Sequence, residues 1–331
     1  MRILVTGGAG YIGSHALAWL ARQGHDVWAY DNLCRGHRGA VPADRLVVGD
    51  LLDTPRLLAC LRERRIEAVM NFAALTQVGE SVERPLAYYR TNVGGVVSLA
   101  EAMVQAGVRR LVHSSTTAVF GNPAVERIGE QLPRAPMNPY GHSKAISERI
   151  LEDAAAAHGL TVIALRYFNA AGACPSGERG EDHRPETHLI PVALESAMGK
   201  RPLLKIFGGD YPTADGSCIR DYVHVDDLAA AHTLALDKTE SVSAAGRFDA
   251  FNLGSGCGYS NLEVVETCRR VTGLPIPIRV VERRMGDPPR LVADPERARR
   301  ELGWVPRYAD LDSIIGTAWN WHRGRPNGFA D

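Results

Sequence analysis

The sequence predicts an α/β protein, with a doubly wound parallel sheet and a smaller second lobe. Short apolar strands alternate with helical stretches through the first half of the chain. This is the pattern of a parallel sheet whose strands are buried on both faces. A glycine-rich turn follows the first strand directly. After residue 169 glycine, proline and charged residues become frequent, which marks the start of the second lobe.

Each element follows from its local pattern. Apolar and β-branched runs between turn signals predict strands at 3–6, 27–30, 46–48, 68–72, 111–114 and 162–167. Helical spacing of apolar residues predicts helices at 12–23, 54–65, 92–106, 140–158 and 191–199. Residues 173–187 are predicted to form a loop, 207–217 turns, and 251–254 a return into the main sheet. We therefore expect a main lobe at 1–172, with a return near 222–254, and a discontinuous, interleaved second lobe at 173–331.

Bulk properties narrow the class of protein. The chain has 331 residues, 45% hydrophobic residues and a formal net charge of +0, which argues against nucleic acid or a membrane surface as partner. No apolar run reaches the ~20 residues of a membrane helix. The six cysteines are scattered without C-x-x-C spacing. They predict reduced thiols in a cytoplasmic enzyme, with neither disulfides nor a metal site.

The glycine turn has the spacing expected of a dinucleotide site. Gly7, Gly10 and Gly13 form G-x-x-G-x-x-G between a strand and a helix, where backbone and helix N-terminus can receive a diphosphate. Asp31 ends the second predicted strand. Its carboxylate can accept both ribose hydroxyls and would repel a 2′-phosphate, so the cofactor predicted is NAD and not NADP. Asp50, which ends the third strand, is either an adenine contact or a helix N-cap.

Tyr140 and Lys144 stand four residues apart at a predicted helix start, in the run NPYGHSK at 138–144. Residues at i and i+4 share a helix face, and a nearby ammonium lowers the pKa of a phenol. The chain has 34 arginines and only four lysines, so a lysine at this place is informative. We expect Tyr140 to act as a proton-transfer group.

With these residues the chain resembles the extended short-chain dehydrogenase/reductase family. The runs TGGAGYIGSH at 6–15 and DNL at 31–33 carry that resemblance together with the Tyr140/Lys144 pair. Further runs are similar to those of the UDP-glucose 4-epimerase family: VGES at 78–81, YFN at 167–169, RDYVHVDDL at 220–228 and GD at 286–287.

The resemblance implies a Rossmann-like fold that binds NAD and a UDP-sugar, with catalytic residues Thr116, Tyr140 and Lys144. Tyr140, as phenolate, would take the proton of the sugar 4-hydroxyl while the C4 hydride passes to the nicotinamide. The 4-keto sugar would then turn over and receive the hydride on its other face. The implied cofactor contacts are Gly7, Gly10, Tyr11, Ile12, Gly13, Asp31, Asn32, Asp50, Leu51, Phe72, Ala73, Ala74, Asn92, Tyr140, Lys144 and Tyr167.

For the sugar nucleotide, the resemblance implies two phosphate-binding arginines, an aspartate for the uridine ribose and flanking backbone for uracil. The implied substrate contacts are Thr116, Asn169, His188, Leu189, Ile206, Phe207, Arg220, Arg284 and Asp287. Three positions depart from the commonest pattern. Thr76 replaces a lysine near the cofactor and His188 replaces an asparagine at the β-phosphate. Leu291 occupies the wall position linked to N-acetyl sugars.

Several functions remain open at this point. Related 4,6-dehydratases carry Asp-Glu directly after the threonine, where this chain has Thr117 and Ala118, so epimerisation is favoured. UDP-pentose, UDP-uronate and UDP-N-acetylhexosamine substrates are alternatives to UDP-glucose and UDP-galactose. A non-catalytic sensor would not need the proton-transfer residues. The resemblance also implies a homodimer through the helices at 92–106 and 140–158, with Ile146, Ile150 and Leu151 as candidate contacts.

Overall fold

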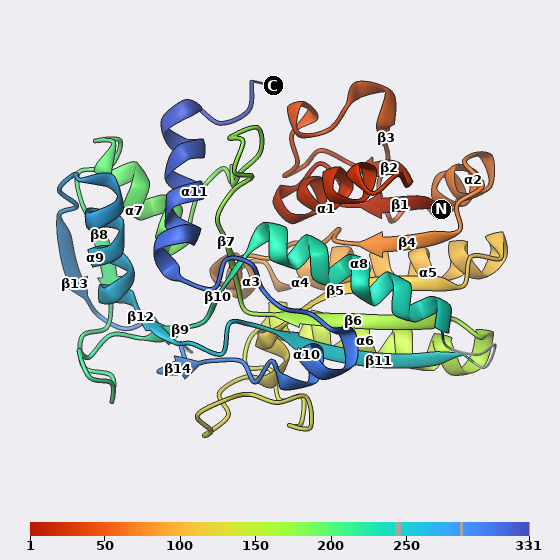
Figure 1. Ribbon diagram of the computed structural model, residues 1–331. Helices are drawn as coiled ribbons and strands as arrows, with labels where there is room; N and C mark the ends of the chain where they lie inside the picture. The colour runs from red at the N-terminus through yellow and green to blue at the C-terminus, as the bar shows by residue number, and fades with distance from the viewer. Residues whose placement is uncertain (242–245, 285–286, 331) are drawn as a thin grey trace.

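A parallel sheet with helices on both faces forms the larger part of the molecule (Figure 1). The computed structural model describes residues 1–241, 246–284 and 287–330; Gly286 of the 286–287 motif lies outside them. The described residues form a seven-stranded sheet in the order β11-β6-β5-β4-β1-β2-β3. Every pairing in it is parallel. The strand order reverses between β1 and β4, where open α/β sheets bind ligands at the carboxyl ends of their strands.

The predicted fold class is confirmed, and the predicted main-lobe elements are present with shifted ends. The sheet strands are β1 (Arg2–Thr6), β2 (Asp26–Asp31), β3 (Leu46–Val48), β4 (Ala68–Asn71), β5 (Arg110–Thr116), β6 (Thr161–Tyr167) and β11 (Arg247–Leu253). The helices that cover them are α1 (Tyr11–Arg22), α2 (Thr54–Glu63), α5 (Gly95–Ala106), α6 (Pro139–His158) and α8 (Val225–Ser241).

Two hydrophobic cores pack on the two faces of this sheet. On β1 the side chains alternate: Ile3 and Val5 join the core that contains Leu17 of α1, while Leu4 joins the core that contains Leu99 of α5. This alternation is the period-2 geometry of a strand buried on both faces. In the described residues, no helix is both long and apolar enough to cross a bilayer.

The second lobe lies at one end of the main sheet (Figure 1). Its strand pairs are β8 (Leu204–Phe207) with β13 (Ile278–Val281), and β9 (Ile219–Arg220) with both β12 (Tyr259–Ser260) and β14 (Arg290–Leu291). Its helices include α7 (Leu189–Ala197), α9 (Asn261–Thr272) and α11 (Leu311–Gly324), and α10 (Glu296–Leu302) lies near β11. The pair β7 (Asn169–Ala171) and β10 (Tyr222–His224) connects the lobes. The chain re-enters the main sheet at β11, as the sequence predicted for 251–254.

Short irregular helices differ from the sequence prediction. Residues 78–94 form α3 (Val78–Glu83), α4 (Pro85–Tyr88) and the π-helix η3 (Tyr89–Gly94), so the helix predicted at 92–106 begins as a π-turn. A π-turn has no sequence signature, and such turns often lie at functional sites. The remaining short turns are η1 (Arg38–Ala40), η2 (Ala43–Arg45) and η4 (Thr117–Phe120).

Candidate active site

The glycine turn brings the backbone of the β1–α1 connection against the end of β4. Gly7 has a φ of 70°, and a Cβ there would lie 2.6 Å from the backbone nitrogen of Ala73. A Cβ on Gly13 would lie 2.2 Å from the Gly7 carbonyl oxygen, so a larger residue at either place would displace the backbone. Gly10 is the N-cap of α1 and gives its first turn no side-chain acceptor. The N–H groups of that turn therefore suit a diphosphate.

Tyr11 and Ile12, two predicted cofactor residues, begin α1. The Tyr11 hydroxyl donates a hydrogen bond to the Gly172 carbonyl oxygen at 2.6 Å. Burial raises the pKa of Tyr11 well above its usual value, so the hydroxyl remains a donor. Ile12 is half-buried and packs on the core. Tyr11 thus ties the glycine turn to the segment that enters the second lobe.

Asp31, Asn32 and Asp50 meet where β2 and β3 end. The two Asp31 carboxylate oxygens accept hydrogen bonds from the backbone N–H groups of Ala9, at 2.9 Å, and Leu33, at 2.8 Å. Burial raises the Asp31 pKa. The Asn32 amide donates to the Asp50 carboxylate at 2.8 Å. This carboxylate pair, joined to the glycine turn through Ala9, fits the ribose and adenine of a dinucleotide.

Asp53, and not Asp50, caps α2, because the Asp53 carboxylate accepts a hydrogen bond from the Arg56 N–H. This removes the N-cap alternative for Asp50. Leu51, the next predicted cofactor residue, is 8% exposed and packs in the core beside Leu99.

The end of β4 carries Phe72, Ala73 and Ala74, all half-buried. The Phe72 N–H donates to the Thr6 carbonyl at 2.8 Å, which holds this segment beside the glycine turn. The Phe72 ring contacts the His232 ring with 4.5 Å between centroids.

Asn92 lies in the π-helix η3 and is 2% exposed. Its side-chain oxygen accepts from the Leu75 N–H at 2.8 Å, and its amide donates to the Leu75 carbonyl and the Ser143 hydroxyl, each at 2.9 Å. These bonds occupy the Asn92 amide within the protein. They fasten the loop after β4 to α6, a role that the sequence did not indicate.

Thr116, Tyr140 and Lys144 meet where β5 ends and α6 begins. Tyr140 is 8% exposed and Lys144 is 3% exposed. The Thr116 side chain lies beside the Tyr140 phenol and opposes the rise in the phenol pKa. The Lys144 ammonium donates to the Ser114 carbonyl oxygen at 2.8 Å. The three predicted catalytic residues are therefore brought together in one buried place.

Helix caps at the start of α6 and at the start of η4 fix the positions of these three residues. The Asn138 side chain accepts a hydrogen bond from the Gly141 N–H at 2.9 Å, which sets where α6 begins. The Thr116 hydroxyl oxygen accepts from the Ala118 N–H at 3.2 Å and so caps η4. The Thr116 hydroxyl can accept from this turn and still bond to a second group, because a hydroxyl both donates and accepts.

The expected lowering of the Tyr140 pKa by Lys144 is not found in the protein alone. Burial raises the Tyr140 pKa to about 12, against an opposing effect of the Thr116 hydrogen bond. Burial also lowers the Lys144 pKa to about 8, although Glu148 opposes it. The physical reason is that the ammonium donates to the Ser114 carbonyl, while both side chains are desolvated. A cofactor that adds positive charge beside Tyr140 would oppose this rise in the phenol pKa.

Glu148 is a positioning residue that the sequence reasoning missed. It lies one helical turn after Lys144 and is 0% exposed. Its carboxylate accepts from the Ser115 hydroxyl at 2.5 Å and from the Arg166 guanidinium at 2.9 and 2.6 Å. Glu148 therefore ties α6 to β5 and β6. The spacing of Tyr140, Lys144 and Glu148 at i, i+4 and i+8 was the available signal.

Tyr167 and Asn169 extend the site along β6 and β7. The hydroxyls of Tyr167 and Ser114 are hydrogen-bonded, so Tyr167 lies beside the carbonyl that holds Lys144. Asn169 pairs with Tyr222 of β10, and its N–H donates to the Asp221 carbonyl at 3.0 Å. The residue paired with Asn169 therefore lies two positions after Arg220 in the chain.

The predicted nucleotide residues of the second lobe form two contacting pairs. Arg220 lies 3.6 Å from the Asp287 carboxylate, and its guanidinium also donates to the Pro288 carbonyl at 2.9 Å. The Arg284 guanidinium stacks on the Phe207 ring at 3.8 Å. Ile206, beside Phe207 on β8, is 1% exposed, so its side chain is not available to a ligand.

His188 occupies the N-cap position of α7, which begins at Leu189, and its side chain makes no hydrogen bond to that helix. Its Nδ1 atom bonds to the Glu181 carboxylate. Burial would lower the His188 pKa, but the negative charge of Glu181 outweighs this and raises it. The Glu181 carboxylate thus favours the protonated form of the His188 ring. Leu189 is half-buried against the second-lobe core.

Comparison with known proteins places this geometry in a family. The family model described as "NAD dependent epimerase/dehydratase family" matches residues 3–254. The chain belongs to this family. It is 50% identical over 332 residues to the UDP-glucose 4-epimerase of Lacticaseibacillus casei, covering 100% of this chain and 99% of the relative.

Solved structures agree across the whole chain. The UDP-glucose 4-epimerase of Brucella ovis in complex with NAD has a TM-score of 0.92 at 48% identity, covering 96% of this chain and 97% of that one. The UDP-glucose 4-epimerase of Bifidobacterium longum in complex with NAD⁺ and UDP has a TM-score of 0.93 at 35% identity, covering 99% and 100%. Membership of the family confirms the predicted NAD cofactor. The close backbone at Gly7 and Gly13 and the carboxylate of Asp31 fit that group.

Proposed function

We propose that the protein is an NAD-dependent UDP-sugar 4-epimerase that interconverts UDP-glucose and UDP-galactose. The observation that carries this proposal is that the buried side chains of Thr116, Tyr140 and Lys144 all lie where β5 ends and α6 begins in an NAD-binding fold. The names of the relatives support the choice of sugar. NAD, when bound, supplies the acceptor and later the donor of the C4 hydride.

The chain's own residues handle the proton. Tyr140 takes the proton of the sugar 4-hydroxyl as that carbon is oxidised, and returns it to the oxygen when the carbon is reduced. Thr116 lies beside the phenol and can bond to the same sugar oxygen, because a hydroxyl both donates and accepts. Lys144, as an ammonium, stabilises the phenolate electrostatically. No proton is gained or lost over the full cycle, which is what a reversible epimerisation requires.

Elimination of water is disfavoured at this site. A 4,6-dehydratase needs an acid after the threonine, but Thr117 and Ala118 follow Thr116 here. Thr117 is 8% exposed and its hydroxyl oxygen has no hydrogen-bond partner among the described residues. A neutral hydroxyl and a methyl group cannot replace a carboxylic acid as proton donor, so the 4-keto sugar would keep its 6-hydroxyl.

The nucleotide site proposed for the second lobe uses charge and stacking. Arg220 and Arg284 would bind the diphosphate, because a guanidinium grips phosphate oxygens in bidentate fashion. Asp287 would bind the uridine ribose, and the backbone of 206–207 would flank uracil. His188 would approach the β-phosphate. In this proposal the lobe at 1–172 binds NAD and the lobe at 173–331 binds the UDP-sugar.

A substrate panel tests the proposal. Purified protein given UDP-galactose is expected to yield UDP-glucose without added NAD, measured by chromatography of the sugar nucleotides. UDP-N-acetylglucosamine, UDP-glucuronate and UDP-arabinose serve as competing substrates. Absence of C4 inversion in every arm, with NAD supplied, would refute an epimerase and favour a sensor. Turnover of another sugar in preference to UDP-galactose would keep the chemistry and replace the substrate.

A cytoplasmic homodimer is also part of the proposal. All six cysteines are free thiols. Ile146 on α6 and Val97 on α5 are exposed by 41% and 38% although large and apolar, whereas Leu151 is fully buried. Exposed apolar side chains on neighbouring helices are typical of an interface. Light scattering should report a monomer for Ile146→Glu and a dimer for Val305→Glu, a control at an exposed valine outside these helices. A wild-type monomer would refute the dimer.

A further inference from the structure

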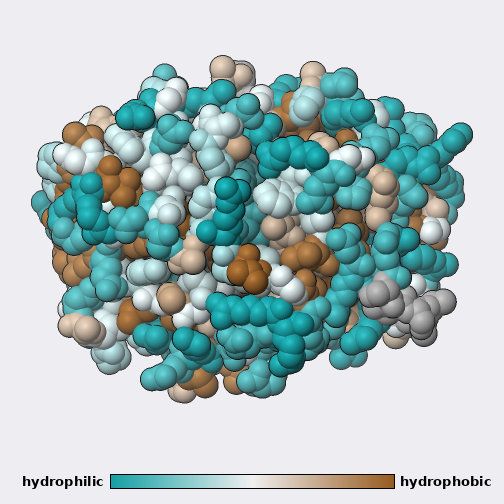
Figure 2. Space-filling view, in the orientation of Figure 1, coloured by the Kyte–Doolittle hydropathy of each residue, from teal (hydrophilic) through white to brown (hydrophobic). Residues whose placement is uncertain are grey.

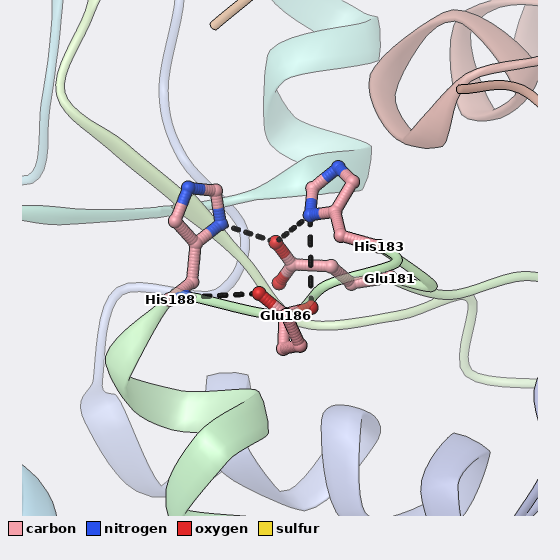
Figure 3. Close-up of side chains that lie close together, drawn as sticks. All are labelled: Glu181, His183, Glu186 and His188. Carbon is pink, nitrogen blue, oxygen red and sulfur yellow. Dashed lines mark hydrogen bonds and ion pairs between the residues drawn. The ribbon is translucent and has the colours of Figure 1, made fainter. Parts of the chain in front are cut away.

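Four potential metal ligands meet in the loop before α7, far along the chain from the catalytic pair. Glu181, His183, Glu186 and His188 each offer one ligand atom, and these atoms lie within 4.8 Å of one another. Figure 3 shows both imidazoles turned toward the carboxylates, with Nδ1 as the facing nitrogen of each ring. We call residues 181–188 the strap.

The spacing within the cluster is close to that of a coordination sphere. The His183 Nδ1 atom lies 3.1 Å from the Glu181 carboxylate and 3.6 Å from the Glu186 carboxylate. Ligands placed tetrahedrally about Zn²⁺, with bonds of ~2.0–2.2 Å, lie roughly 3.3–3.5 Å from one another. The two His183 distances are thus close to those of a tetrahedral site, whereas the His188 and Glu181 ligand atoms, which now bond to each other, would have to separate to admit an ion.

The surrounding structure holds the Glu186 carboxylate in place for such an ion. One of its oxygens accepts hydrogen bonds from the backbone N–H groups of Thr187, at 2.7 Å, and His188, at 2.8 Å. The other oxygen is left to face His183. The backbone carbonyl of Glu181 accepts from the Trp321 indole at 3.1 Å. Fixed outer contacts of this kind orient metal ligands.

Charge and access also suit a divalent cation. The side chains of Glu181 and Glu186 are 4% and 5% exposed, and those of His183 and His188 are 24% and 48% exposed. Two buried carboxylates would balance the charge of the ion, while the imidazoles leave an entry from the surface. A cavity of about 240 Å³ borders Glu181, His183 and Glu186.

We propose that the strap binds one first-row divalent transition-metal ion, preferably Zn²⁺, through Glu181, His183, Glu186 and His188. Two imidazole nitrogens and two carboxylate oxygens are ligands that Zn²⁺ accepts in tetrahedral sites. The sequence reasoning missed this set because it looked for metal ligands among the cysteines. The competing explanation is an ion-pair network without metal, since the same groups already form hydrogen bonds with one another.

The ion would fasten the strap to both lobes. The His183 ring contacts the Tyr11 ring of the glycine turn, with 6.2 Å between centroids and an edge-to-face arrangement. The Gln77 amide donates to the Pro185 carbonyl at 3.2 Å. An ion on Nδ1 of His188 would leave Nε2 as the N–H donor. This last consequence rests on the proposed function, because the partner expected for Nε2 is the β-phosphate.

The test measures metal without any sugar nucleotide, so its outcome is independent of the epimerase proposal. Full-length protein is stripped with chelator, incubated with Zn²⁺, desalted and analysed by mass spectrometry of the metal. About one Zn²⁺ per chain is expected for wild type and for two controls, Glu178→Gln and His158→Ala. Both controls alter exposed side chains, the first in the loop just before the strap. Glu181→Gln and His183→Ala are expected to retain at least tenfold less zinc.

A second measurement keeps the proposal testable if those variants do not fold. Co²⁺ added to stripped wild-type protein is expected to give the intense visible absorption of tetrahedral cobalt, and Zn²⁺ is expected to displace it. Either of two results would overturn the proposal: wild type that holds no more zinc than Glu181→Gln, or cobalt spectra like those of the hydrated ion. The strap would then be an ion-pair network only.

Discussion

The proton-transfer site and the strap contain similar groups in opposite settings. At the first site, Lys144, Glu148 and Arg166 are almost fully buried, and regular elements position each of them. In the strap, the charged groups lie on a loop between β7 and α7, and both imidazoles, those of His183 and His188, are partly exposed. Regular elements hold the Tyr140 phenol in a buried setting that raises its pKa to about 12, whereas the shape of the strap depends on its ion pairs. Substitutions should therefore affect chemistry at the first site and local order at the second.

The largest expected effect is that of Tyr140→Phe. Removing the hydroxyl deletes the proton acceptor but keeps the ring, so kcat should fall by about 10³-fold, within the range for loss of a general base. NAD content should be unchanged, because the Phe side chain fills the same volume. Steady-state kinetics and the absorbance of released cofactor measure both. A variant that retains most of its rate would remove Tyr140 from the proton transfer.

Glu148→Gln should have the next largest effect, which is a loss in the free energy of unfolding. The substitution leaves the Arg166 guanidinium buried without its charge partner, and breaking a buried pair costs roughly 3–5 kcal/mol. Denaturant unfolding measures this loss.

The matched control is Asp153→Asn on the same helix, whose ion pair with Arg149 is exposed by 64% and 70%. Such surface pairs contribute about 0–1 kcal/mol. Equal losses of stability for Glu148→Gln and Asp153→Asn would mean that burial does not determine how much an ion pair contributes to stability.

Asp31→Ala should weaken NAD binding by roughly 10–100-fold, since a hydrogen bond to a charged group contributes about 1.5–3 kcal/mol. It should also narrow the preference for NAD over NADP, because the negative charge that opposes a 2′-phosphate is removed. Calorimetric titration of both cofactors measures the change. An unchanged ratio of the two dissociation constants would contradict the role given to Asp31.

The smallest predicted effect is a pH dependence in the strap of metal-free protein. Burial alone would lower the His183 pKa, but Glu181 and Glu186 raise it to about 10. A group whose folded pKa is raised stabilises the fold fully below its unfolded pKa of ~6.5, and this contribution is lost as pH rises toward the folded value. His183→Ala should therefore destabilise the protein more at pH 6 than at pH 10. A difference that grows with pH would contradict this sign.

The sequence predicted the positions of those candidate site residues that follow from spacing along a single helix, strand or turn. The i, i+4 pair on α6, the glycine turn and Asp31 at the end of β2 lie in regular structure, so their positions followed from the pattern alone. The π-turn that places Asn92 could not be predicted, because a widened turn leaves no periodic signal. Nor could the Tyr140 pKa be predicted, since it depends on desolvation by the assembled fold and not on its helix neighbour alone.

The second lobe was harder to predict for a related reason. Its contacts join residues far apart in the chain, such as Arg220 with Asp287 and Tyr11 with the strap. His188 was predicted as a β-phosphate contact, and its bond to Glu181 was not predicted because both residues lie in an irregular loop. Chain spacing carries no information about such loop contacts.

Isotope transfer tests the central claim most directly. UDP-galactose carrying deuterium at C4 is incubated with the protein in ordinary water, and the product is analysed by NMR. We expect UDP-glucose with deuterium retained at C4, because the same hydride leaves and returns while Tyr140 moves only the hydroxyl proton. Deuterium at C6, or its loss to water, would contradict reversible oxidation at C4 and with it the proposed epimerase.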